Sequence, residues 1–261
     1  MTRRALAALA ALLITAPASA QTVTFERLGM GEVPAGFQIG LTGDGLVGLW
    51  TTVRDGGAAG GVAFEQRTPD QTSNRFPLAV YSLFSAKDVG ATVRFKSVAG
   101  HVHQAAGLAV RVIDENNYYV AVADCIANRI TLNRVVAGRL EEIQGVVQPV
   151  ATATWHELGL RAAGDAFTVS FEGAELFTVR DTAFGVAGHL ALWTEADTIA
   201  RTNLGGSAPQ ESTMSAKPIL IASAGALALG AAALVAFAAD QRPDFTAGGQ
   251  PMTQEQIVQK M

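Results

Sequence analysis

Short runs in which apolar and polar side chains alternate dominate the middle of this chain. In the segment TVRFKSV, Val93, Phe95 and Ser97 fall on one side, and Arg94 and Lys96 fall on the other. Successive side chains of a β-strand point to opposite faces of the sheet, so this pattern indicates a strand with one buried face. No comparable helical period occurs between residues 21 and 205.

The same pattern predicts a series of strands separated by turn residues. They are Thr22–Phe25, Leu46–Val53, Gly61–Glu65, Leu78–Phe84, Val89–Val98, Gly107–Ile113, Tyr118–Asp124, Arg129–Val136, Leu140–Val146, Trp155–Ala162, Ala166–Phe171, Ala174–Asp181 and Gly188–Glu195. Gly, Asp and Asn cluster in the gaps, as in tight turns. No unit repeats at a fixed period, which disfavours a propeller or a solenoid. The prediction is therefore one all-β domain over residues 21–205, a two-sheet antiparallel sandwich of the jelly-roll kind.

The first twenty residues predict a secretory signal peptide. Arg3 and Arg4 precede a short apolar run, and Ala18-Ser19-Ala20 forms an A-x-A cleavage sequence. The apolar run is too short to span a bilayer. We therefore expect an exported protein, located in the periplasm.

A second apolar stretch lies near the other end of the chain. After a linker at 206–217, residues 218–239 contain no charge and are long enough to form a membrane-spanning helix. This segment also resembles a signal peptide inside the chain, because Met214 and Lys217 precede it and Ala236-Phe237-Ala238 could be cleaved. The alternatives are an inner-membrane anchor followed by a polar, disordered tail at 240–261, or a fused or mispredicted reading frame.

Composition excludes some classes of protein. The chain has one cysteine, Cys125, and a net charge of -4, so no intramolecular disulfide can form and a hydrophobic core must supply the stability. No block of Lys or Arg is dense enough to follow a phosphate backbone, and we expect no nucleic-acid partner.

Five segments in order carry a resemblance to a known family. DVGATVRFK, AAGLAVRVIDENNYYVAV, RITLNRVVAGR, WHELGLRAAGDAFTVSFEGAELFTVRD and FGVAGHLALWTEADTIARTNL resemble the concanavalin A-like jelly rolls, namely the laminin G-like domains and the 3-keto-disaccharide hydrolase family. The match covers about residues 78–204. The resemblance implies a β-sandwich that binds or cleaves carbohydrate.

The region around DENN, residues 114–117, supplies the predicted binding site. DENN itself suits a hairpin turn. Alternation places Leu108, Val110 and Val112 on one face and Ala109, Arg111 and Ile113 on the other. A guanidinium and aromatic rings on one sheet face suit a sugar, so the predicted ligand-binding residues are Arg111, Tyr118, Tyr119, Arg129 and Arg134. The alternative is that Arg111 pairs with an acidic residue inside the protein and that the tyrosines cover the core.

Other polar residues raise weaker possibilities. Laminin G-like domains can hold calcium, and Asp44, Asp114 and Asp197 are the candidate ligands; no other cofactor is expected. His101 and His103 share one side of a strand or loop and could contribute to a metal site, although no third ligand is identified. Trp155 and Trp193 are expected to pack in the core.

The sequence identifies no catalytic pair. Glu157, Glu172, Glu175 and Glu195 are the carboxylates relevant to glycoside cleavage, which needs two such groups across a sugar. The E-x-D-x-E pattern of catalytic jelly-roll glucanases is absent. The leading hypothesis is an exported domain that binds a carbohydrate or another cell-envelope component on a sheet face or its rim loops. The alternatives are a hydrolase or lyase acting on keto-sugar glycosides, and a structural envelope protein without a small-molecule ligand.

Overall fold

The computed structural model describes residues 23, 25 and 29–203. The predicted signal peptide, the linker at 206–217, the apolar segment at 218–239 and the tail at 240–261 lie outside the described residues. Within them, the secondary structure is β-strands and one short 3-10 helix, η1 (Ala59–Gly61). No helix in this described part is long and apolar enough to cross a membrane.

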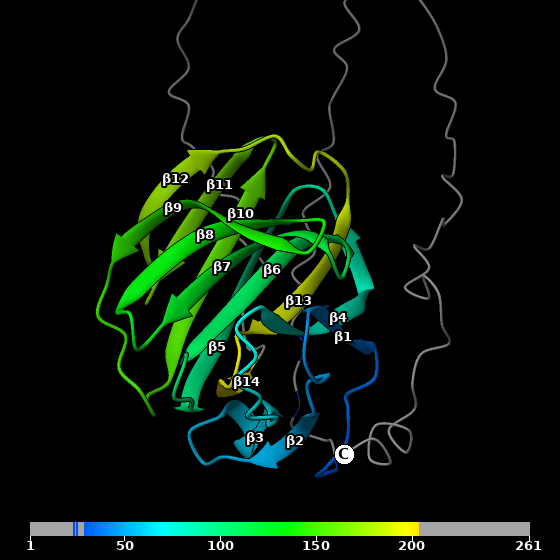
Figure 1. The fold of residues 1–261 in the computed structure, drawn as a ribbon, viewed down its shortest axis with the longest axis vertical. Helices are drawn as coiled ribbons and strands as arrows, with labels where there is room; N and C mark the ends of the chain where they lie inside the picture. Colours follow the sequence, from blue (N-terminus) through cyan, green and yellow to red (C-terminus); the bar gives the residue numbers. More distant parts are fainter. Residues whose placement is uncertain (1–22, 24, 26–28, 204–261) are drawn as a thin grey trace, which may run out of the picture.

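The strands form two seven-stranded antiparallel sheets packed face to face (Figure 1). Sheet A has the order β1 (Phe37–Gly43), β4 (Arg75–Ala86), β13 (Gly188–Thr194), β6 (Ala105–Asp114), β7 (Asn117–Asp124), β8 (Arg129–Val136) and β9 (Arg139–Val147). Sheet B has the order β12 (Ala174–Arg180), β11 (Ala166–Phe171), β10 (His156–Ala163), β5 (Val89–Ala99), β14 (Ile199–Asn203), β3 (Val62–Gln66) and β2 (Trp50–Arg54). The predicted all-β sandwich is confirmed.

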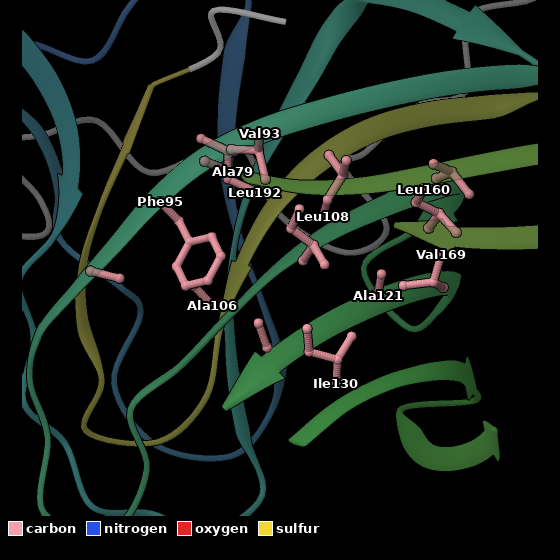
Figure 2. Packing of buried hydrophobic residues seen from close by; sticks show 14 of the residues in the cluster. Ala79, Val93, Phe95, Ala106, Leu108, Ala121, Ile130, Leu160, Val169 and Leu192 are labelled. Carbon is pink, nitrogen blue, oxygen red and sulfur yellow. The ribbon is translucent and has the colours of Figure 1, made fainter. Parts of the chain in front are cut away.

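The main core lies between the two sheets. Figure 2 shows Phe95, Leu160 and Val169 of sheet B close to Leu108 and Ile130 of sheet A. Val93 and Phe95 are buried as their alternation predicts. Each fully buried apolar side chain of this size contributes about 1.5–3 kcal/mol relative to exposure, so this core can stabilise the domain without a disulfide.

Two strands were not predicted. β1 pairs with β4, and β14 lies between β5 and β3. The glycines Gly40 and Gly43 interrupt the apolar pattern of β1, and β14 is five residues long. Both strands owe their conformation to their neighbours in the sheet rather than to a strong local pattern.

The predicted faces of β6 are correct up to Val110 and wrong after it. Leu108 and Val110 lie in the main core, whereas Ala109 lies in a second cluster on the opposite face of sheet A. Arg111 has a positive φ of 50°, and the β6–β7 register shifts after Val110. This bulge places Val112 on the face of Ala109, because one extra residue reverses the alternation.

Candidate functional site

Three of the five predicted binding residues meet at the connection between β12 and β13. Arg111 is 1% exposed, and its guanidinium donates to the backbone carbonyls of Lys87, Phe184 and Gly164 at 2.6–2.8 Å. It also lies 3.5 Å from a carboxylate oxygen of Asp88 and packs over the ring of Phe167. These contacts match the internal-pairing alternative.

Tyr119 and Arg134 hold the same connection through Asp181. The buried Tyr119 hydroxyl donates to Asp181 at 2.6 Å and accepts the amide of Phe184 at 3.1 Å. Burial and the bond to Asp181 raise the pKa of Tyr119 to about 12. Arg134 pairs with Asp181 at 2.7 Å and with Glu141 at 2.9 Å. This network joins β7 and β8 of sheet A to the connection between β12 and β13, which contains Asp181 and Phe184.

Tyr118 points to the opposite face of sheet A. We call this the outer face, because it is turned away from sheet B. There the apolar cluster comprises Phe76, Leu78, Val80, Ala105, Ala109, Val112, Tyr118, Val120, Val122, Val135, Ala191 and Trp193. The Tyr118 hydroxyl accepts Trp193 Nε1 at 3.2 Å and shares a hydrogen bond with Thr42 at 2.9 Å. Trp193 therefore packs as predicted and is fully buried.

The turn between β6 and β7 lies against β1 at this end of the outer face. Thr42 donates to the backbone carbonyl of Glu115, and a Cβ added to Gly40 would lie 3.4 Å from a carboxylate oxygen of Glu115. The predicted DENN turn is also present, since Asp114 accepts the amide of Asn116 and the side chain of Asn117. The Tyr118 hydroxyl and the turn beside it are therefore already hydrogen-bonded to other parts of the protein.

The other end of the outer face is polar, and Arg129 lies there. Strand register sets Ala105 opposite Asp124 and Asp124 opposite Arg129, and directly opposed residues share a face. Five side chains form one row, which we call the polar strip: Glu195, His103, Asp124, Arg129 and Glu142. They belong to β7, β8 and β9 and to the residues that flank β13 and β6.

His103 lies between two carboxyl groups of the polar strip. Its Nδ1 is 3.1 Å from Asp124 Oδ2, and its Nε2 is 3.4 Å from Glu195 Oε1. The imidazole therefore occupies the space between them. Burial raises the pKa of Glu195, and the Asp124 charge adds to this effect, while His103 opposes it.

Asp197 holds the loop that carries His103. Its carboxylate is 2% exposed and accepts the backbone amides of His101, Val102 and His103 at 2.6–3.2 Å. Burial acts to raise the pKa of Asp197, but these amides outweigh it and leave the pKa below its usual value. Glu195 and Asp197 both belong to the connection between β13 and β14. Asp197 binds the backbone of the loop at residues 101–103, and Glu195 contacts the imidazole of His103.

Arg129 and Glu142 form the other part of the polar strip. The Arg129 guanidinium pairs with Glu142 across β8 and β9, and both side chains are more than 40% exposed. The guanidinium crosses Gly145, where an added Cβ would lie 2.6 Å from Nη2. Beside them, Asn133 Nδ2 donates to Thr131 Oγ1 at 2.8 Å. The polar strip thus presents guanidinium, imidazole and carboxylate groups in one row.

The three proposed calcium ligands have separate roles. Asp114 stays within its turn, Asp197 binds loop amides, and Asp44 donates its own amide to the carbonyl of Asn74. Among the described residues, no group of three or more His, Cys, Asp or Glu side chains is arranged to hold a metal ion.

The remaining candidates lie on or beside sheet B. Glu172 pairs with His156 at 2.8 Å, and Glu175 accepts Thr178 Oγ1 at 2.9 Å. Glu157 lies opposite Arg94 on neighbouring strands. Trp155 is partly exposed rather than fully in the core. Its ring contacts Arg94 and Lys96, and its Nε1 donates to Asp55 at 3.4 Å.

The sequence analysis identified His103, Arg129 and Glu195 as candidates, but it did not place them in one site. It did not identify Asp124 or Glu142. The alternation within β7 puts Asp124 on the face of Tyr118, Val120 and Val122, and this signal could have identified it. The approach of Glu195 to His103 depends on β13 lying beside β6, which local patterns do not specify.

Comparisons with solved structures identify the fold. The carbohydrate-binding module CBM66 from Bacillus subtilis superposes with a TM-score of 0.52 and 18% identity, covering 65% of this chain and 94% of that one. Domain 4 of AbnA, a GH43 extracellular arabinanase from Geobacillus stearothermophilus solved with arabinotriose, has a TM-score of 0.45, 15% identity and coverages of 73% and 94%. The β-glucanase of Bacillus licheniformis has a TM-score of 0.46, 8% identity and coverages of 72% and 96%.

Comparisons at the sequence level give no family. No protein-family model matches the chain, and no curated protein matches it. The similarity to CBM66 is a similarity of fold, since the identity is 18%. The chain therefore shares a two-sheet β-sandwich fold with the CBM66 module.

Proposed function

We propose that this protein binds a carbohydrate through the polar strip on the outer face of sheet A. The observation that carries the proposal is the row itself, in which Glu195, His103, Asp124, Arg129 and Glu142 come together from separate strands and remain partly exposed. Charged donors and acceptors form the stronger hydrogen bonds available to hydroxyl groups.

The neighbouring surface supports the same proposal. Ile126, which is 49% exposed, and Val147, which is 84% exposed, flank Asp124 and Arg129. Aliphatic side chains can contact the C–H groups of a sugar. The carbohydrate-binding module CBM66 has the same fold, which makes this ligand class a reasonable first choice.

The proposal includes export. The N-terminal sequence supports secretion, and a periplasmic or envelope glycan would then be accessible. The mass of the protein purified from the periplasm tests this part. A chain that begins at Gln21 supports export and cleavage, and a chain that retains Met1 in the cytoplasm contradicts both. A mass that ends near Ala238 would exclude a retained membrane anchor.

Calorimetric titration of the full chain, guided by a glycan array, tests carbohydrate binding. We expect Arg129→Ala and Asp124→Asn each to weaken binding by about tenfold or more, which is about 1.4 kcal/mol. Arg180→Ala is the matched control, because Arg180 also pairs with a single carboxylate on the surface but lies on β12. Binding that none of these changes affects would place the ligand elsewhere, and an array without any bound glycan would reject the proposal.

A hydrolase is the second candidate, and Glu195 favours it. A partly buried carboxyl with a raised pKa suits a general acid, and the resemblance to the 3-keto-disaccharide hydrolase family points to glycosides. His103 occupies the space between Glu195 and Asp124, so the two carboxyl groups do not face each other across a sugar. Glu195 would therefore act with His103 as its proton partner.

Incubation with 3-keto-glycosides tests this second candidate. Turnover that Glu195→Gln abolishes and Glu175→Gln preserves would support it. The control residue Glu175 is an exposed glutamate on β12. The absence of product with the wild-type chain, or turnover unchanged in Glu195→Gln, would contradict it.

A further inference from the structure

The charged side chains of the polar strip differ in the number of ion pairs and hydrogen bonds that they form. The guanidinium of Arg129 is already paired with Glu142. Asp124 accepts the amides of Ile126 and Ala127 at 2.8 and 3.1 Å, in addition to its contact with His103. The partly buried Asp124 carboxylate therefore has several donors nearby, and the exposed Glu142 has the guanidinium of Arg129.

Glu195 forms the longest of the three ion pairs in the polar strip. Its side chain is 16% exposed, and its contact with a donor group among the described residues is His103 Nε2 at 3.4 Å. The same imidazole is closer to Asp124 on its other side. Burial raises the pKa of Glu195, and the charge of His103 acts against this effect. A buried carboxylate is costly unless a cation or several donors accompany it.

Within residues 29–203, His103 is the ion-pair partner of Glu195, and no lysine or arginine pairs with this carboxyl group. Among the described residues the lysines are Lys87 and Lys96, in the β4–β5 turn and on β5 of sheet B. Arg75 is fully buried, and its guanidinium donates to the carbonyls of Leu46 and Ala196. The residues beside Glu195 on the outer face are apolar or small, such as Trp193 and Ala105.

We propose that the polar strip selects glycans that bear free amino groups, with Glu195 as the residue that determines this preference. The inference rests on the proposed function, because it names the ligand class of the same site. An ammonium group would bring both the positive charge and the donors that Glu195 lacks, and the nearby Asp124 would add to the attraction. An acidic sugar would meet three carboxyl groups, while the guanidinium of Arg129 is already engaged by Glu142.

The test compares three oligosaccharides of equal length by calorimetric titration of the full chain. The probes are tetramers of β-1,4-linked glucosamine, of N-acetylglucosamine and of galacturonic acid. We expect the amine-bearing tetramer to bind about tenfold more tightly than the acetylated one and the uronate to bind most weakly. Equal affinity for the amine-bearing and acetylated probes, or tighter binding of the uronate, would overturn the inference.

Two variants locate the preference. Glu195→Gln should bring the affinities for the amine-bearing and acetylated tetramers close together, and Glu175→Gln should leave the ratio of the two affinities unchanged. A preference that persists in Glu195→Gln would assign it to another group and overturn the role of Glu195. If Glu195→Gln does not fold, the three-probe comparison on the wild-type chain still decides the ligand class. Binding of neutral glucans without any amine preference would leave the proposed function intact and reject only this inference.

Discussion

Replacing Asp197 with alanine should destabilise the protein strongly, because one buried carboxylate holds three consecutive backbone amides. The amides of His101, Val102 and His103 lie 2.6–3.2 Å from its oxygens. A hydrogen bond to a charged group contributes about 1.5–3 kcal/mol. Water can reach the exposed loop once the carboxylate is removed, so we expect a total loss of about 3 kcal/mol rather than the full sum.

Urea unfolding of the wild type and the variant measures this loss, and thermal melting checks it. At about 2–4 °C for each kcal/mol in a domain of this size, the melting temperature should fall by roughly 6–12 °C. Asp197→Asn should lose less, because the amide oxygen can still accept one or two of the bonds. A change below about 0.5 kcal/mol, typical of a surface substitution, would refute the role assigned to this carboxylate.

The sign of the pH dependence provides a second check. The pKa of Asp197 is lower in the folded protein than its ordinary value of about 3.9. The stabilisation is therefore fully present above about pH 4 and is lost as the pH falls through the lower folded-state value. The difference in stability between wild type and Asp197→Asn should be constant at neutral pH and should shrink in acid. A difference that grows below pH 4 would contradict the reasoning.

Three further substitutions test other parts of the structure. Arg111→Met should cost about 3 kcal/mol or more in urea unfolding, because it leaves the carbonyls of Lys87, Phe184 and Gly164 without their donor; a neutral result would show that these bonds contribute little. Tyr119→Phe removes the hydrogen bond to Asp181 and should cost about 1–2 kcal/mol, with sugar binding unchanged in calorimetric titration. Gly145→Ala would place a Cβ 2.6 Å from Arg129 Nη2 and 2.8 Å from the methyl group of Thr131, so we expect a stability loss of about 1–3 kcal/mol and severalfold weaker sugar binding. Unchanged sugar affinity in Gly145→Ala would separate the position of Arg129 from ligand binding.

The site illustrates where prediction from single strands stops. The alternation in β7 separates Tyr118 from Tyr119, and the structure places them on opposite faces of sheet A. The same rule fails at Arg111, because its positive φ forms a bulge that turns the guanidinium toward Phe167. Nothing in the apolar pattern of β6 marks that residue as a bulge.

The sequence by itself determined the fold class, most of the strands and the DENN turn, because alternation and turn chemistry are properties of adjacent residues. The tertiary structure decided which polar side chains meet. Glu195 reaches His103 because β13 pairs with β6 across about eighty residues of chain, and Asp124 lies beside Arg129 through the register of β7 and β8. Strand order and register arise from packing of the whole sandwich, so a row built across strands becomes visible only when the sheet is assembled.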